Sequence, residues 1–304
     1  MQTLMRDSSR ALILLILAIT VAFPAQAAYE YTAINYPSAT QTQIFGINNA
    51  GELAGDGTVG STAIPFVYDS KKNAFTVLPS VPGFDFTVAT GINNPGTVVG
   101  GASDTSGAES GTLLDKGAYS LFTNPGFFVT EARGISNNGM VAGDSIDSTF
   151  SNYVGFLYDP KRNTFTNFLP SGATITQGVN SQGDIVGSVA LVTGYPGSTP
   201  GFYGFVRHKD GSVILFRVQD SSTATRARGI TESGLITGFF GNSPGLKGFV
   251  VHVSGKASYE VLTLKSDQVL AVPGATDTIA EGINDKGQVC GNADSQGFLA
   301  TPTQ

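Results

Sequence analysis

The sequence predicts an all-β fold, a six-bladed β-propeller with four antiparallel strands in each blade. Three observations lead to this prediction. A ten-residue motif that opens and closes on Gly occurs six times. Strand-like segments follow the copies in a regular order. The composition, with 39 Gly and 13 % charged residues in 304, is too poor in charge and in helix-forming residues for a coiled coil.

The repeated motif has the pattern of a β-hairpin. Its copies are GINNAGELAG from Gly46, GINNPGTVVG from Gly91, GISNNGMVAG from Gly134, GVNSQGDIVG from Gly178, GITESGLITG from Gly229 and GINDKGQVCG from Gly282. An Asn, Ser or Asp favours the start of a turn, and the Gly at its end suits a positive φ. Pro95 is unfavourable at the third position of a type I turn, so we expect a shifted or type II turn in the second copy. The closing Gly indicates tight backbone packing or a bulge.

Two further strands are expected after each hairpin. The third strands are PFVYD from Pro65, GTLLD from Gly111, GFLYD from Gly155, GFVRH from Gly204, GFVVH from Gly248 and GFLAT from Gly297. The fourth strands are FTVLP from Phe75, YSLFT from Tyr119, FTNFL from Phe165, VILFR from Val213 and YEVLT from Tyr259. The sixth unit lacks a fourth strand, whereas the chain opens with a suitable one, YTAIN from Tyr31.

This permutation predicts how the ring closes. The N-terminal strand, Tyr31–Asn35, should pair with the last hairpin and join the two ends of the chain without a disulfide. A linear solenoid is the alternative, but it needs polar capping repeats and none is recognisable. No Pro/Ser-rich or charged linker interrupts the copies, so we expect a single domain over residues 28–304.

Residues 1–27 have the pattern of a secretory signal peptide. Arg6 and Arg10 precede an apolar run over 11–23, and Ala25-Gln26-Ala27 fits a cleavage site. We therefore expect a secreted protein, extracellular or periplasmic, without a membrane anchor after cleavage. The sequence leaves the oligomeric state open.

The repeat resembles a known family. The unit GINNxGxVVG, followed by a strand such as GFLYD and a strand such as FTVLP, is similar to the HAF-type repeat of bacterial extracellular proteins. The resemblance covers about residues 31–302. It implies an exported, propeller-like protein, and it implies no catalytic residues. The third strands depart from the commonest form of the repeat because they lack a preceding His.

Composition and motifs exclude several functions. A net charge of −6 without a basic cluster argues against nucleic acid or an anionic membrane as a partner. No phosphate-binding loop or nucleophile elbow is present, and we predict no cofactor. His208 and His252 end third strands and are interpreted as turn caps, so no metal site is predicted. Cys290 stands in a column of small residues and is interpreted as structural.

The best candidate surface is the loop face of the third to fifth copies. Its weak ligand-binding candidates are Asp144, Asp147, Tyr153, Tyr195, Tyr203, Phe239, Phe240 and Asn242. Exposed aromatics on a rigid scaffold suit sugar rings or peptides. The plainer interpretations remain open: the aromatics pin a long loop as a local core, and acids such as Asp56 and Asp144 are solvated turn residues.

Two functions follow from this surface. The first is a binding or scaffold propeller that presents variable loops to an extracellular glycan or peptide, with no catalytic residue. The alternative is a polysaccharide-active hydrolase or lyase that uses a carboxylate pair near the central channel. An enzyme requires acids, or an acid with Tyr or Arg, that converge within about 5–10 Å at the channel mouth.

Overall fold

The computed structural model describes residues 29–168, 173–191, 200–218, 224–253 and 258–303, and the regular elements in these segments are β-strands apart from one short 3-10 helix. The predicted signal peptide, residues 1–27, lies outside them. Within the described segments no helix is long and apolar enough to cross a membrane.

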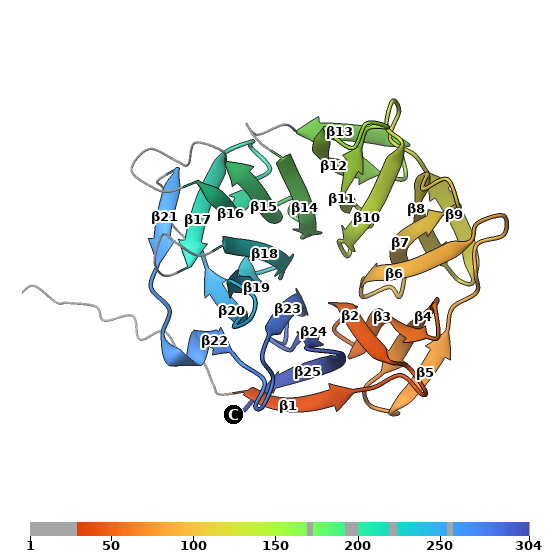
Figure 1. Cartoon of the computed structure of the whole chain (residues 1–304). Coiled ribbons are helices and arrows are strands. Elements are labelled where there is room, and N and C mark those ends of the chain that lie inside the picture. Colours follow the sequence, from red (N-terminus) through yellow and green to blue (C-terminus); the bar gives the residue numbers. More distant parts are fainter. Residues whose placement is uncertain (1–28, 169–172, 192–199, 219–223, 254–257, 304) are drawn as a thin grey trace, which may run out of the picture.

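In each repeat unit four strands lie side by side, one after another from the centre of the molecule to its rim (Figure 1). The outer strand of the sixth unit is the N-terminal strand of the chain. The innermost strands are β2 (Gln41–Ile47), β6 (Phe86–Ile92), β10 (Val129–Ile135), β14 (Ala173–Val179), β18 (Ala224–Ile230) and β23 (Thr278–Ile283). The second strands are β3 (Glu52–Val59), β7 (Val98–Ser103), β11 (Val141–Ile146), β15 (Ile185–Leu191), β19 (Leu235–Gly241) and β24 (Val289–Ala293). The third strands are β4 (Thr62–Asp69), β8 (Glu109–Asp115), β12 (Tyr153–Asp159), β16 (Gly201–Arg207), β20 (Lys247–His252) and β25 (Gln296–Pro302). The outer strands are β5 (Ala74–Val77), β9 (Ala118–Phe122), β13 (Thr164–Phe168), β17 (Val213–Val218), β22 (Val269–Leu270) and β1 (Tyr29–Ile34).

Neighbouring strands within each unit pair antiparallel in chain order. The second and third units are joined into one eight-stranded sheet, because β10 pairs parallel with β8 at Val129 and Glu109. The N-terminal strand β1 pairs antiparallel with β25 over Tyr29↔Pro302 to Ile34↔Gly297, as the permutation predicts. Ile34 is buried there beside Ile44 and Leu299, so apolar packing supports the pairing of the two ends of the chain.

The fifth unit departs from the sequence prediction. We expected Tyr259 to begin its fourth strand, but β21 (Tyr259–Leu262) pairs parallel with β17 of the preceding unit. A short 3-10 helix (Ser266–Gln268) follows, and β22 takes the outer position beside β20. Packing explains the exchange, because the fully buried Leu270 of β22 fits against Gly248.

The hairpin turns confirm the expected role of Gly at their ends. Gly51, Gly139 and their equivalents have φ between 74° and 91°. The second copy does not have the shifted turn that we expected from Pro95. Its Gly96 N–H donates to the Asn93 carbonyl at 3.0 Å and has φ 88°, as in the other copies. The fixed φ of Pro95 is therefore accommodated in the common turn.

The opening glycines of the motif form a ring around the channel, which we call the waist. A Cβ on Gly46 would lie 2.8 Å from the Cα of Gly91, and one on Gly282 would lie 3.2 Å from the Cα of Gly46. The other opening glycines lie just as close to the next unit. Any side chain at these positions would push neighbouring units apart, which explains why Gly recurs.

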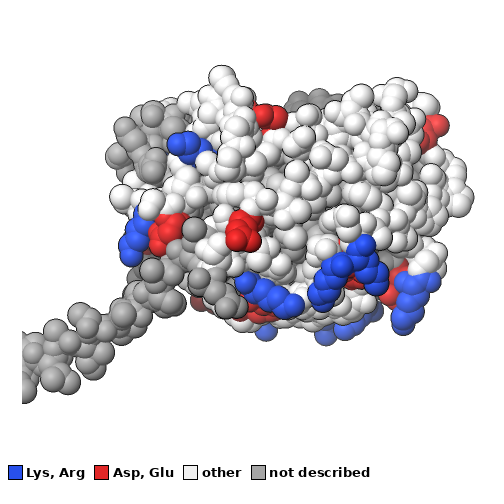
Figure 2. All heavy atoms as spheres, turned by 90° about the horizontal axis from the view of Figure 1, so that it is seen from below, with Lys and Arg blue, Asp and Glu red and all other residues white. Residues whose placement is uncertain are grey.

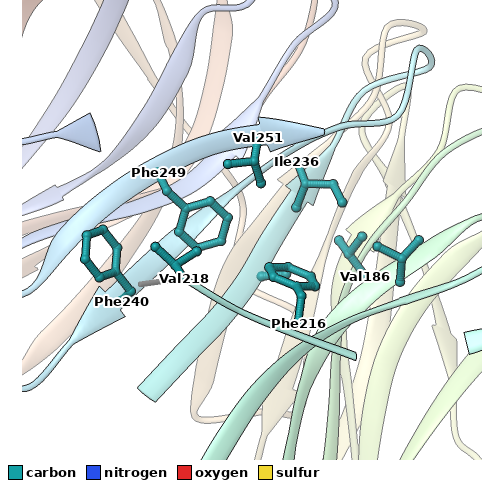
Figure 3. Packing of buried hydrophobic residues seen from close by; sticks show 9 residues of the cluster. Val186, Phe216, Val218, Ile236, Phe240, Phe249 and Val251 are labelled. Atoms are coloured by element: carbon teal, nitrogen blue, oxygen red, sulfur yellow. The ribbon is translucent and has the colours of Figure 1, made fainter. Parts of the chain in front are cut away.

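The hydrophobic core lies between neighbouring sheets rather than at the centre. Figure 3 shows the layer between the fourth and fifth units, where Phe216 and Val218 of β17 meet Ile236 and Phe249 of β19 and β20. Each sheet therefore buries both of its faces. The channel at the centre is lined by polar side chains, glycines and six aliphatic residues, Ile47, Ile92, Ile135, Val179, Ile230 and Ile283.

Candidate ligand-binding site at the channel mouth

The channel has two different ends, because every innermost strand runs in the same direction along it. The strands end at the hairpin turns, and the turns form a ring that we call the belt: Asn49, Asn94, Asn137, Ser181, Glu232 and Asp285. Hydrogen bonds link its members: Asn49 N to Asn94 Oδ1 (2.7 Å), Asn94 N to Asn137 Oδ1 (3.0 Å), Asn137 Nδ2 to Glu232 Oε1 (2.9 Å), Ser181 N to Glu232 Oε2 (3.0 Å), Glu232 N to Asp285 Oδ1 (2.9 Å) and Asp285 N to Asn49 Oδ1 (2.9 Å). These hydrogen bonds use the side-chain acceptor atoms of the belt, so the belt residues hold neighbouring units together.

Behind the belt, the first Asn of the motif connects neighbouring units. Asn48 is buried, and its Oδ1 accepts from the N–H groups of Ala50 and Glu52 at 3.0 Å. Its Nδ2 donates to the carbonyl of Asn93 in the next unit at 3.2 Å. Asn284 donates in the same way to the carbonyl of Asn48. The Asn of the motif therefore holds its own turn and the adjacent unit at once.

At the other end, which we call the mouth, the channel is lined by the residue before each opening Gly. These residues are Phe45, Thr90, Arg133, Gln177, Arg228 and Glu281. Arg133 is the centre of an ion-pair network, with its Nη2 2.6 Å from Glu131 Oε2 and its Nε 3.0 Å from Asp144 Oδ1. We call Glu109, Glu131, Arg133 and Asp144 the mouth cluster.

The residues of the mouth cluster are largely shielded from solvent, and this burial shifts the pKa values of Glu109, Glu131 and Arg133. Although burial alone would lower the pKa of Arg133, the carboxylates of Asp144 and Glu131 hold it above its usual range. Burial raises the pKa of Glu131. Burial, with a further contribution from the charge on Glu131, raises the pKa of Glu109 to about 8. Glu109 is thus mostly protonated at neutral pH, near the guanidinium of Arg133.

Glu109 occupies a space that the repeat provides. A Cβ at Gly101 would lie 1.9 Å from Glu109 Oε1, so only Gly allows this placement of the carboxyl group. Glu109 Oε1 is buried and has no hydrogen-bond partner. Leaving such an atom unpaired has a cost in free energy, and this cost favours the neutral acid.

Exposed aromatic side chains lie beside the mouth cluster. Phe150 is 55 % exposed, and its ring meets the edge of Phe128 at a centroid distance of 6.0 Å. The carbonyl of Phe128 in turn accepts from the backbone N–H of Glu109 at 3.2 Å. A backbone hydrogen bond therefore links Phe128, one ring of the aromatic pair, directly to Glu109.

The eight-stranded sheet extends this surface into a row. Backbone pairing runs from Phe86 to Ser103, Glu109, Val129, Ile146 and Tyr153 across six strands. At about 4.8 Å between strands, the row is roughly 24 Å long. Phe86, 49 % exposed, marks one end, and the half-buried Tyr153 marks the other. Figure 2 shows the rim of the molecule from below, where Lys and Arg gather mainly along the lower border and the other charged side chains are scattered.

Three of the predicted ligand-binding residues lie on accessible parts of the loop face. Asp147 builds a turn, because its Oδ1 accepts from Thr149 N at 3.1 Å and from Ser151 N at 3.1 Å. These hydrogen bonds, led by those from Asn152 and Thr149 side chains, lower the pKa of Asp147 to about 2. The turn presents Phe150. Tyr153 begins β12 as described, and Asn242 is exposed after β19. Tyr195 lies outside the described residues.

The expectation of exposure is wrong for three aromatics and for two acids. Tyr203 is fully buried under Arg217 and against Tyr259, Phe240 belongs to the core of Figure 3, and Phe239 is buried beneath Arg226 and Arg228. These residues belong to the core, in line with the plainer interpretation, and the loop over 192–199 lies outside the described residues. Asp56 and Asp144 are not solvated turn residues, because strands β3 and β11 continue through them and bury both. Burial raises the pKa of Asp56 to about 6.

Sequence reasoning missed Glu131, Arg133, Arg226, Arg228 and Phe150 as site residues. A signal was present, because the residue before each opening Gly varies while the motif around it does not. Three of its six occupants are charged in a chain with few charges. Among the described residues no group of three or more His, Cys, Asp and Glu is arranged to hold a metal ion. Cys290 is buried, and burial raises the pKa of its thiol.

Comparison with known proteins gives the fold. No family model and no curated protein matches the sequence. A streptogramin B lyase aligns with a TM-score of 0.54 at 10 % identity, over 90 % of this chain and 98 % of that one. A gluconolactonase from Xanthomonas campestris aligns with a TM-score of 0.55 at 11 % sequence identity, over 92 % of this chain and 91 % of that one. The U3-55K structure aligns with a TM-score of 0.51 at 12 % sequence identity, over 88 % of this chain and 78 % of that one. At this identity the likeness shows the fold alone, and that fold is an all-β propeller of repeated sheets.

Proposed function

We propose that the chain is a secreted, six-bladed propeller whose mouth face binds an extracellular glycan. Six motif copies, the pairing of β1 with β25 and the waist of glycines support six blades in a closed ring. The signal-like residues 1–27 and the resemblance to HAF-type repeats support export. A binding surface needs rigid, exposed groups, and the mouth face offers them.

The observation that carries the proposal is the presentation of Phe150. An apolar ring that is 55 % exposed is unfavourable in water, yet a turn tied by Asp147 and an edge contact with Phe128 hold it in place. Such a ring can stack on a sugar with little loss of conformational entropy. The polar groups of the mouth cluster lie beside it and can bond to sugar hydroxyls.

An array of extracellular glycans and peptides tests this proposal. We expect the wild-type protein to bind glycans and the Phe150→Ala variant to lose that binding. Leu121→Ala is the matched control, because Leu121 is 48 % exposed on the outer strand β9, away from the channel. Binding to peptides alone, or equal binding by the wild type and Phe150→Ala, would overturn the proposal.

Hydrolysis or elimination of a polysaccharide is the second candidate, and one observation favours it. Glu109 is neutral at pH 7, while the Asp144 carboxylate beside Arg133 is ion-paired. An acid and a carboxylate in different environments are what general acid–base chemistry requires. If the protein is such an enzyme, Glu109→Gln abolishes turnover and Asp147→Asn keeps it. Turnover retained by Glu109→Gln excludes this role for Glu109.

A further inference from the structure

The positive charges of the mouth are distributed unevenly among its carboxylates. In the third unit, Arg133 has two carboxylate partners, Glu131 and Asp144. In the fifth unit, Arg226 and Arg228 share the single carboxylate Glu281, whose Oε2 is 3.3 Å from Arg228 Nε. Arg226 makes no ion pair with any residue that the structure describes. One side of the mouth therefore has an excess of positive charge.

Arg226 is held in place without a charged partner. It pairs across the hairpin with Phe239. Its guanidinium carbon lies 4.0 Å from the ring centroid of Phe202 and 5.9 Å from that of Phe239. Stacking on aromatic faces fixes the plane of the guanidinium and leaves its N–H donors at the edge of that plane. The side chain is half-buried, so it reaches both the aromatic rings and the solvent.

This arrangement has an energetic cost that a ligand can remove. Burial and the neighbouring charge of Arg228 lower the pKa of Arg226, and the carboxylate of Glu281, which the two arginines share, offsets this lowering only in part. An anionic group with two adjacent oxygens, such as a carboxylate or a sulfate ester, would form charge-assisted, bidentate hydrogen bonds with the edge of the guanidinium. A singly charged group fits better than a doubly charged phosphate, because Glu281 is close by and repels negative charge.

We infer that Arg226 binds a singly charged anionic substituent, a carboxylate or a sulfate ester, on the glycan at the mouth face. The inference rests on the proposed function for the polymer and adds the class of sugar. The exposed ring of Phe150 contacts a sugar ring, and Arg226 binds the acidic group across the channel. The carboxylates of the third unit disfavour the same group on their side, so charge sets the orientation of the ligand.

The test compares oligosaccharides with one backbone in three forms: neutral, uronic-acid-containing and sulfated. Calorimetric titration of the wild type should show tighter binding of the acidic forms, and the stronger of the two names the group. Arg226→Gln should weaken acidic binding about tenfold or more and leave neutral binding unchanged. Arg226→Lys should be intermediate, because it keeps the charge and loses the bidentate geometry. Lys247→Gln, an exposed cation at the start of β20, should have no effect.

Two outcomes separate this inference from the proposed function. Equal binding of neutral and acidic forms, unchanged in Arg226→Gln, overturns the inference and leaves glycan binding intact. If no oligosaccharide binds, glycan recognition fails, and free glucuronate is the remaining probe of Arg226. Binding of glucuronate by the wild type and its loss in Arg226→Gln would then support the anion site, and absence of binding would overturn it. Near-ultraviolet circular dichroism confirms that each variant is folded.

Discussion

The belt and the mouth are the two ends of one channel, and the same strands build both. Just behind the belt, the first polar residue of the motif is Asn in four of the six units, and each of these Asn side chains bonds to the next unit, for example Asn48 to the Asn93 carbonyl. At the mouth, the equivalent positions of different units hold Phe45, Thr90 and Arg133. The repeated end holds the units together, and the varied end is free to carry a site. In this chain, internal variation between units therefore locates function better than recurrence does.

The largest effect on stability should come from a substitution just behind the belt. Asn48→Ala removes three hydrogen bonds that hold its own turn and one that reaches the next unit, at a buried side chain. We expect a loss of about 2–4 kcal/mol in the free energy of unfolding. Urea unfolding measures it. Asn242→Ala, at an exposed position, is the control and should change little. A loss below about 1 kcal/mol would contradict the structural role of the Asn48 side chain.

The next effect tests whether the mouth also stabilises the fold. Asp144→Asn leaves Arg133 with Glu131 as its one ion-pair partner. Removing one partner from a buried pair leaves a charge without full compensation, so we expect a loss of about 2–3 kcal/mol. Thermal unfolding at neutral pH and at two salt concentrations measures this loss. An unchanged midpoint would show that the ion pair contributes nothing to stability.

A pH dependence of stability tests the mouth cluster through Glu109. The pKa of Glu109 is about 8 in the folded protein, above the ordinary value of 4.5 for an unfolded chain. The folded state therefore holds this proton more tightly, and its stabilising effect is complete below pH 4.5 and lost as pH rises toward 8. Glu109→Gln should lessen the decline in stability over this window by up to about 1.4 kcal/mol per pH unit. Parallel stability curves for the wild type and the variant would contradict the raised pKa.

The smallest effect on stability should accompany the removal of the presented ring. Phe150→Ala removes an exposed side chain with one ring contact, so we expect a change within about 0.5 kcal/mol. The same urea titration measures it. A loss of several kcal/mol would place Phe150 in the core and remove the argument that its ring is kept exposed for a ligand.

The fold could be predicted in most respects because the information is local and repeated. Turn glycines such as Gly51, strand alternation and the displaced first strand are visible in the sequence, and β1 lies where the permutation places it. The fifth outer strand could not be predicted, because β21 and β22 are both plausible strands. The choice depends on how Leu270 fits against Gly248 in the assembled core.

The site could be predicted only in outline. The loop face, Asp144 and Asp147 were found, but burial was misjudged for Tyr203, Phe239 and Phe240 because composition does not show which rings a neighbouring unit covers. The mouth cluster joins residues from two units, and Glu109 enters it through a parallel contact between β8 and β10 that no local pattern indicates.

Measuring ligand binding by Asn48→Ala and Phe150→Ala tests most directly the claim that the belt end stabilises the fold while the mouth binds the ligand. The ligand is the glycan that the array selects, and both variants are held well below their unfolding midpoints. The account predicts that Asn48→Ala binds as the wild type does and that Phe150→Ala does not. Loss of binding in Asn48→Ala with retention in Phe150→Ala would contradict it.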